Sequence, residues 1–368
     1  MKSLFLTVVL FVSMTTFAQK DELKTLKKIY FKENISNEDL KKYKESSDKL
    51  ISIASSESDK KYAHFFKVIY PTIDLASKGV NATMEDQIKL FNPDFLEEYG
   101  KTIDRIIELE QNNGKYIYSD DLKNKKADFR ELLNNTATKL YKENKFREAS
   151  LMFHNLYIFD TKNEGLALEN SAQLSIQAGD YLLADRFYDE LKNSDYLKSV
   201  SYYAINKMDN TEDLFPNKEA RDNMVSLGTY EKPRDEKLEE KKGEVYKMIA
   251  LVALQNKNID KAKEAFEIAK SLNVNDEQLI NGEFQMYFSL GYDIVVKDKE
   301  IVDEINKNLE NKQKFDELMN KRKELFKKSL PYFEKALELS PEDQNTKKVL
   351  KMSYEVLEMK DKAEALNQ

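Results

Sequence analysis

Residues 168–191 decide the fold of this chain, and they read LENSAQLSIQAGDYLLADRFYDEL. Apolar and small side chains recur at the spacing of one helix face before the turn Ala178–Tyr181, and again after it. Gly179 in the turn is the residue type that most readily ends a helix. The stretch therefore predicts two helices joined by a short turn. The positions that mark this pair are Leu168, Ala172, Ser175, Ala184, Tyr188 and Leu191.

The same spacing recurs on both sides of this pair. The N-terminal copy is carried by Leu133, Ala137, Leu140, Phe146, Ala149, Phe153 and Leu156. A copy further along the chain is carried by Tyr246, Ile249, Ala250, Ala253, Ile259, Ala262, Phe266 and Ala269. The last copies are marked by Ser329, Phe333, Ala336, Pro341, Leu350, Tyr354 and Ala363. An internal repeat of helix pairs predicts a stack in which each pair packs against its neighbours.

These residues resemble the tetratricopeptide repeat, which places small Ala residues where paired helices cross and an aromatic residue where the next helix docks. The resemblance covers residues 128–192 and 243–368, about half of the chain. It departs from the repeat at Val274, where the closing Pro is missing, and at Lys351, where the first helix normally has a small residue. It implies an all-α fold, a right-handed superhelical solenoid of antiparallel helix pairs.

The remaining segments do not follow the repeat. We expect an irregular helical region over 19–127, helix pairs over 128–207 with a further helix at 196–207, a charged insertion or loop over 208–242, and helix pairs with capping helices over 243–368. Within the last block, apolar spacing predicts an extended helical hairpin at about 291–328.

Local signals mark three helices in the N-terminal region. Ser36 begins a capping box, and Asn92 can cap a helix that has Pro93 at its first position and runs to about Gly114. Pro71 should kink or shorten a helix that begins near residue 59, because proline lacks a backbone donor.

The first 18 residues predict export. Lys2 is followed by an apolar run from Leu4 to Val12 and by small residues near Ala18, which is typical of a secretory signal peptide. No Cys follows, so the lipid anchor of a bacterial lipoprotein has no attachment atom, and no later segment is apolar enough to cross a membrane. We expect a periplasmic or secreted protein. Residues 315–341, together with this N-terminus, also resemble exported flavobacterial tetratricopeptide proteins, which implies a Gram-negative envelope and no reaction.

Charge and composition argue against several classes of function. The net charge of −7 repels phosphate backbones, so we expect no nucleic-acid partner. The absence of Cys excludes disulfides and thiolate metal sites. His64 and His154 lie far apart in the sequence and form no zinc pattern, and no glycine-rich loop is present to hold a phosphate. We therefore expect no enzyme activity, no cofactor and no metal.

A stack of helix pairs offers a groove lined by its first helices, and we expect a protein or peptide segment to bind there. Helical spacing places the following candidates on the groove face: Asn134, Thr138, Tyr141, Glu169, Gln173, Ile176, Gln177, Lys247, Leu251, Leu254, Gln255, Lys348 and Met352. Their amides can bond to a peptide backbone and their apolar groups can anchor side chains. The alternative is a cell-envelope protein that binds carbohydrate or another nutrient, although the absence of Trp argues against sugar stacking.

Overall fold

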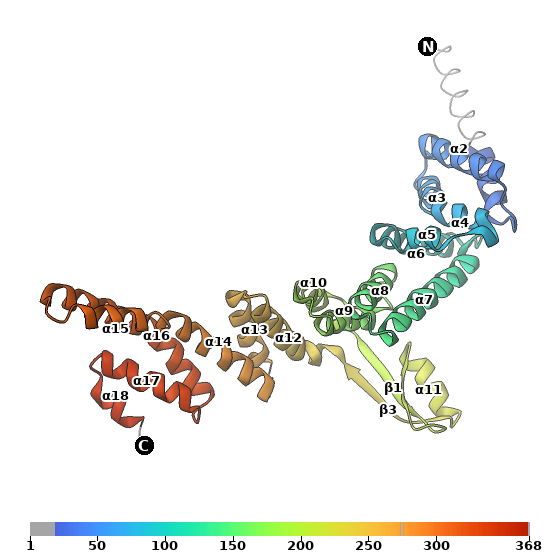
Figure 1. The fold of residues 1–368 in the computed structure, drawn as a ribbon. Helices are drawn as coiled ribbons and strands as arrows, with labels where there is room; N and C mark the ends of the chain where they lie inside the picture. Colours follow the sequence, from blue (N-terminus) through green and yellow to red (C-terminus); the bar gives the residue numbers. More distant parts are fainter. Residues whose placement is uncertain (1–18, 273, 275, 367–368) are drawn as a thin grey trace, which may run out of the picture. The chain divides into compact units, whose positions relative to one another are not determined.

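The computed structural model describes residues 19–272, 274 and 276–366, so the expected signal peptide lies outside the described residues. The chain divides between Asp180 and Tyr181 into two compact units, which we call the N-terminal unit and the C-terminal unit. Helices dominate both units, as Figure 1 shows for each segment. Among the described residues, no helix combines the length and the apolar character needed to span a bilayer.

The N-terminal unit is entirely helical over its described residues. Residues 19–30 form its first helical segment. The others are α2 (Asn37–Ile53), α3 (Glu57–Val68), α4 (Tyr70–Lys78), η1 (Gly79–Asn81), α5 (Met84–Ile88), η2 (Lys89–Phe91), α6 (Pro93–Asn113), α7 (Ser119–Lys142), α8 (Phe146–Phe159) and α9 (Gly165–Gln177).

The local signals in this unit are confirmed. Ser36 caps α2 through a capping box with Asp39. The helix that contains Pro71 is interrupted at Ile69, and Pro71 lies in the first turn of α4, where its missing donor costs no hydrogen bond. Asn92 caps α6 by accepting from Phe95 N at 3.1 Å, and Gly114 ends it in the left-handed region.

A buried carboxylate joins α6 to α7. Glu110 has no exposed surface, and its Oε2 accepts from the backbone N–H groups of Ile117, Tyr118 and Ser119 at 2.8–3.0 Å and from Ser119 Oγ at 2.6 Å. The N-cap residue of α7, Tyr118, supplies no side-chain cap. Glu110 therefore satisfies the free donors at the start of α7 in its place.

Burial and hydrogen bonding shift the pKa of Glu110 in opposite directions. Burial raises it, but the hydrogen bond from the Ser119 hydroxyl and those from the backbone outweigh burial, so the pKa lies below its ordinary value.

A glycine allows α6 to cross α8 closely. The added Cβ of an alanine at Gly100 would lie 1.9 Å from the carbonyl oxygen of Phe159, the last residue of α8. Around this crossing, Tyr99, Phe129 and Phe159 bring their rings within 5.8 Å of one another between centroids. These contacts join the irregular N-terminal helices to the first helix pair.

The C-terminal unit contains helices and one small sheet. Its elements are α10 (Tyr181–Asn193), η3 (Tyr196–Lys198), β1 (Val200–Asn206), β2 (Glu212–Phe215), α11 (Lys218–Ser226), β3 (Tyr230–Lys237), η4 (Leu238–Lys241), α12 (Lys242–Gln255), α13 (Ile259–Ser271), α14 (Glu277–Val295), α15 (Asp298–Lys307), α16 (Lys312–Leu339), α17 (Gln344–Val356) and α18 (Lys360–Ala365).

The predicted helix at 196–207 is wrong, because most of this segment is strand β1. Its run Val200–Asn206 is rich in β-branched and aromatic residues, which favour a strand. β1 pairs antiparallel with both β2 and β3 in the sheet order β2-β1-β3. The charged insertion at 208–242 therefore contains two of the three strands and helix α11 as well as loops.

Arg221 of α11 holds that helix on the sheet. Its side chain is 5% exposed, lies over the ring of Tyr202 and forms ion pairs with Asp222 and Asp235. At the base of the insertion, Leu238 N donates to Ser199 O at 3.1 Å, so the two ends of the insertion meet.

The helix pairs form as the repeat predicts. Successive helices pack antiparallel across short turns, as in α7 with α8 and α12 with α13, and α10 packs against α12. The small residues of the pattern are fully buried at Ala137, Ala149, Ala172, Ala184, Ala250, Ala253, Ala262, Ala269 and Ala336. The prediction of an all-α fold of stacked antiparallel helix pairs is confirmed, with the sheet as a minor addition.

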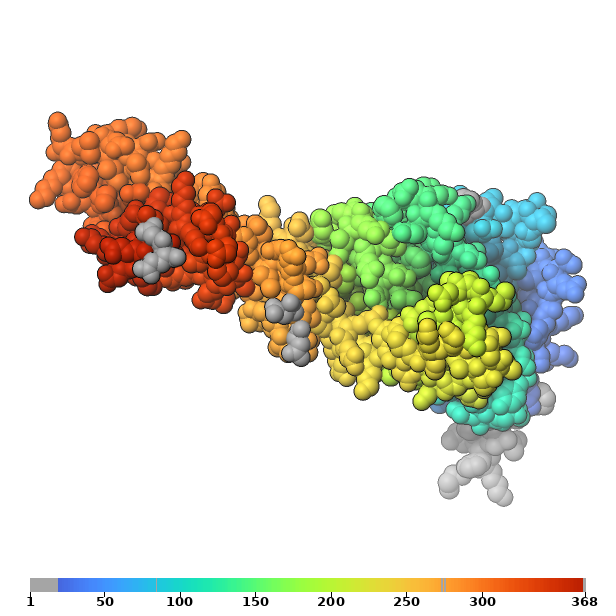
Figure 2. Space-filling model, turned by 90° about the horizontal axis from the view of Figure 1, so that it is seen from below, coloured from blue at the N-terminus to red at the C-terminus, as the bar shows by residue number. Residues whose placement is uncertain are grey.

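One departure from the repeat, Val274, has a structural reason. Val274 donates its backbone N–H to Ala269 O at 3.1 Å, a bond that a closing Pro could not make. At the predicted hairpin, α15 packs on the first half of α16 around Ile301, Ile305 and Leu318. Further along, the side chains of α17 and α18 lie against α16 (Figure 2).

Replacing Glu110 tests its role as the cap of α7. We expect Glu110→Gln to lower the free energy of unfolding at neutral pH by about 2 kcal/mol, because backbone donors lose a charged acceptor. Since the folded-state pKa lies below the ordinary 4.5, the stabilisation is present above that pH and is lost as the pH falls through the folded-state value. Urea denaturation of wild type and variant should therefore converge at low pH. Glu108→Gln, an exposed change on the same helix, is the control. A Glu110→Gln variant as stable as wild type at pH 7 would contradict the capping role.

Candidate functional site

The predicted groove residues fall in both units and are described within each. In the N-terminal unit, α7 and α9 both pack against α8, and Arg130 Nε of α7 donates to Glu164 Oε1 at the start of α9 at 2.6 Å. This ion pair joins the two helices at one end. The candidates in this unit are Asn134, Thr138 and Tyr141 on α7 and Glu169, Gln173, Ile176 and Gln177 on α9.

Four of these side chains are open to solvent. Asn134, Tyr141, Gln173 and Gln177 are exposed, whereas Thr138, Glu169 and Ile176 are half-buried. Within the described part of the chain, no hydrogen bond engages the amide groups of Asn134, Gln173 and Gln177. The Tyr141 ring lies 5.9 Å from that of Phe146, between centroids, which supports it from one side. We call these four residues the amide face.

The candidates in the C-terminal unit divide into packed and open side chains. Lys247 is 6% exposed and forms ion pairs with Glu244, at 2.6 Å, and with Asp276. Asp276 caps α14, so Lys247 links α12 to the start of α14. Two other candidates also pack within the unit, since Leu251 lies against Gly282 and Met352 against the cluster around Phe333.

The open candidates of this unit are Gln255 and Lys348, and Leu254 is half-buried. Helical spacing alone could not separate these three residues from Lys247, because Asp276, one of the two carboxylates that pair with Lys247, is 29 positions further along the chain.

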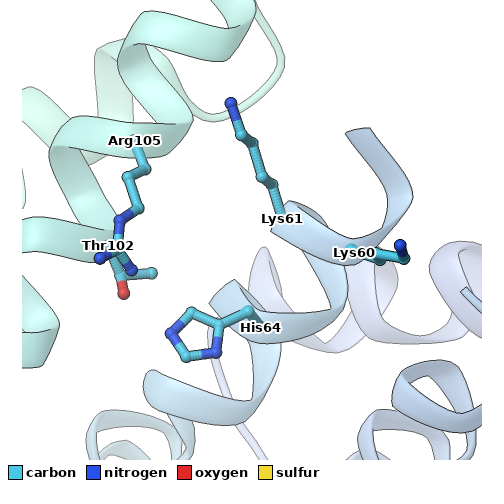
Figure 3. Close-up of a pocket in the computed structure, with 5 residues that line it drawn as sticks. All are labelled: Lys60, Lys61, His64, Thr102 and Arg105. Carbon is cyan, nitrogen blue, oxygen red and sulfur yellow. The ribbon is translucent and has the colours of Figure 1, made fainter. Parts of the chain in front are cut away.

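Sequence reasoning missed a basic pocket between α3 and α6. It has a volume of about 270 Å³ and is lined by Lys60, Lys61, His64, Thr102 and Arg105. Figure 3 shows Lys61, His64 and Arg105 at its border, from both helices, while Lys60 points away. Lys60, Lys61 and His64 share one helix and gave a weak signal, but Arg105 is brought to them only by the packing of α3 on α6.

One carboxylate organises this pocket. Glu98 Oε1 lies 2.7 Å from His64 Nε2 and accepts from Arg105 at 3.0 Å and from the buried Thr102 hydroxyl at 3.3 Å. Burial raises the pKa of Glu98, but the hydrogen bond from His64 and the charge of Arg105 outweigh it, so the pKa lies below its ordinary value. Glu98 therefore stays ionised at neutral pH and fixes the positions of the His64 ring and the Arg105 guanidinium group.

Metal-binding geometry is not found among the described residues, where no three His, Asp or Glu side chains gather closely enough to hold an ion. The second histidine, His154, is half-buried on α8 with its ring 6.2 Å from that of Tyr157, between centroids.

The chain matches no protein-family model, and no curated protein matches it. Among solved structures it is similar to a chain of the APC/C hetero-tetramer Cut9-Hcn1, with a TM-score of 0.27 and 14% sequence identity. The alignment covers 84% of this chain and 52% of the other, so this chain spans about half the length of that one. A likeness at this level assigns no role to any residue.

The burial of Lys247 predicts a structural role. We expect Lys247→Ala to lower the free energy of unfolding by about 1–2 kcal/mol, because Glu244 and Asp276 lose their shared counter-ion. Lys348→Ala removes the same type of side chain from an exposed position on α17 and should leave stability unchanged. Chemical denaturation of both variants measures the difference, and equal effects would contradict this role.

Proposed function

We propose that this chain is a non-catalytic scaffold that binds an extended segment of a partner protein on the amide face of α7 and α9. The observation that carries the proposal is the set of exposed amides at Asn134, Gln173 and Gln177, which have no partner among the described residues. An amide both donates and accepts, as does each backbone peptide group. Exposed side chains of this kind therefore suit a peptide backbone whatever its sequence.

Apolar groups beside the amides would add affinity. Tyr141 is 47% exposed, and Ile176 on α9 is half-buried. An aromatic ring contributes contact area at little entropic cost, because it has few rotatable bonds. Together they offer places where alternate side chains of an extended segment can rest while its backbone meets the amides.

The amide face can be tested with selected peptides. Panning a random peptide display library on the chain should yield binders, and the triple change Asn134→Ala, Gln173→Ala, Gln177→Ala should weaken them about tenfold or more by calorimetry. The control is Asn112→Ala, Gln111→Ala, Gln313→Ala, which removes one Asn and two Gln from exposed positions elsewhere.

Two results would overturn this function. Equal loss in both triple variants would show that the amide face is not the binding site. No selected peptide, together with saturable binding of an oligosaccharide, would favour a carbohydrate-binding protein instead.

We further propose that the scaffold works outside the cytoplasm, in the periplasm or beyond, and that residues 1–18 direct its export. The support is the sequence alone, where a charged start, an apolar run and small residues precede Gln19. Expression of the full chain in a Gram-negative host should release a protein whose intact mass corresponds to a start at Gln19. A full-length mass in the cytoplasmic fraction would contradict export.

A further inference from the structure

The pocket between α3 and α6 concentrates positive charge in an acidic chain. The net charge of the protein is −7, yet the residues that line this pocket include Lys60, Lys61 and Arg105 together with His64. The carboxylates that pair with these residues are Glu98, which binds His64 and Arg105, and Glu57, which pairs with Lys60 at 3.0 Å on the exposed surface. Lys60 points away and is neutralised by Glu57, so Lys61 and Arg105 remain with Glu98 and leave one positive charge in excess.

Lys61 is the donor that the fold leaves unused. Its side chain is exposed, and no hydrogen bond or ion pair engages its ammonium group within the described residues. Arg105 contributes one N–H to Glu98, at 3.0 Å, which leaves other donors of its guanidinium group for a ligand. Figure 3 shows these two side chains on facing helices, with Lys61 extending upward in this view and the guanidinium group of Arg105 extending downward beside Thr102.

The unused donors suit a tetrahedral anion better than a carboxylate. The planar position against Arg105 and His64 is already taken by Glu98. The donors left for a further ligand are the ammonium group of Lys61 on α3 and the remaining guanidinium donors of Arg105 on α6, and both residues line the pocket. An anion with charge on several oxygens arranged in three dimensions can accept from both at once. The volume of about 270 Å³ leaves room for a substituent on that anion.

We propose that this pocket binds a phosphate group, either as the free ion or as the ester of a small organic molecule. Lys61 and Arg105 bind the phosphate oxygens, and Glu98 holds Arg105 and His64 in place. This site lies on α3 and α6, apart from the amide face on α7 and α9, so it adds a ligand to the chain that is independent of the peptide.

Calorimetry with inorganic phosphate and with glycerol 3-phosphate tests the site at low ionic strength, where charge interactions are least screened. We expect saturable binding to the wild-type chain, with affinity reduced about tenfold by Lys61→Gln and more by Lys61→Glu. Lys61 has no partner in the fold, so its replacement should leave the melting temperature unchanged. Lys101→Gln is the matched control, because Lys101 is an exposed lysine on α6 that does not line the pocket.

The two phosphates separate the sources of the ligand. Tighter binding of glycerol 3-phosphate identifies a phosphate ester, and equal or tighter binding of the inorganic ion identifies free phosphate. The proposal is overturned if neither binds saturably, if Lys101→Gln weakens binding as much as Lys61→Gln, or if citrate binds more tightly than both.

Discussion

The close crossing of paired helices is the constraint on which the rest of this structure depends. Ala137, Ala149, Ala172 and Ala184 have no exposed surface, and a larger side chain at any of them would push two helices apart. Gly100 extends the same rule into the irregular N-terminal helices, where α6 touches the backbone of α8. Because the helices are held at such crossings, side chains off the packing stripe are left free for other contacts.

Much of the fold could be predicted because its signals are local. The periodic alanines marked the pairs, and Asn92 and Gly114 marked the ends of α6 to the residue. The strand at Val200–Asn206 was missed because a short run of apolar and aromatic residues fits both a helix and a strand, and its partners β2 and β3 lie in a charged segment. The choice between helix and strand depends on the pairing of β1 with β2 and β3.

The candidate sites show the same difference between features set by local sequence and features set by contacts between distant segments. Helical spacing alone placed Gln173 and Gln177 on an open face, since exposure of a helix side follows from its packing stripe. The burial of Lys247 depends on Asp276, and the basic pocket depends on Arg105 reaching α3, so both follow from contacts between distant segments. The sequence predicts which side chains of one helix are exposed. It does not predict which side chains of a distant helix will contact them.

The sheet insertion interrupts the sequence of the repeat without interrupting its packing. α10 lies directly against α12, Lys261 of α13 pairs with Asp185 and Asp189 of α10, and the insertion leaves and returns at adjacent points, Ser199 and Leu238. The two ends of the insertion therefore meet at one point, beside α10 and α12. A segment whose two ends lie side by side can be replaced by another of the same end-to-end distance. The contacts of α10 with α12 and α13 would then be kept.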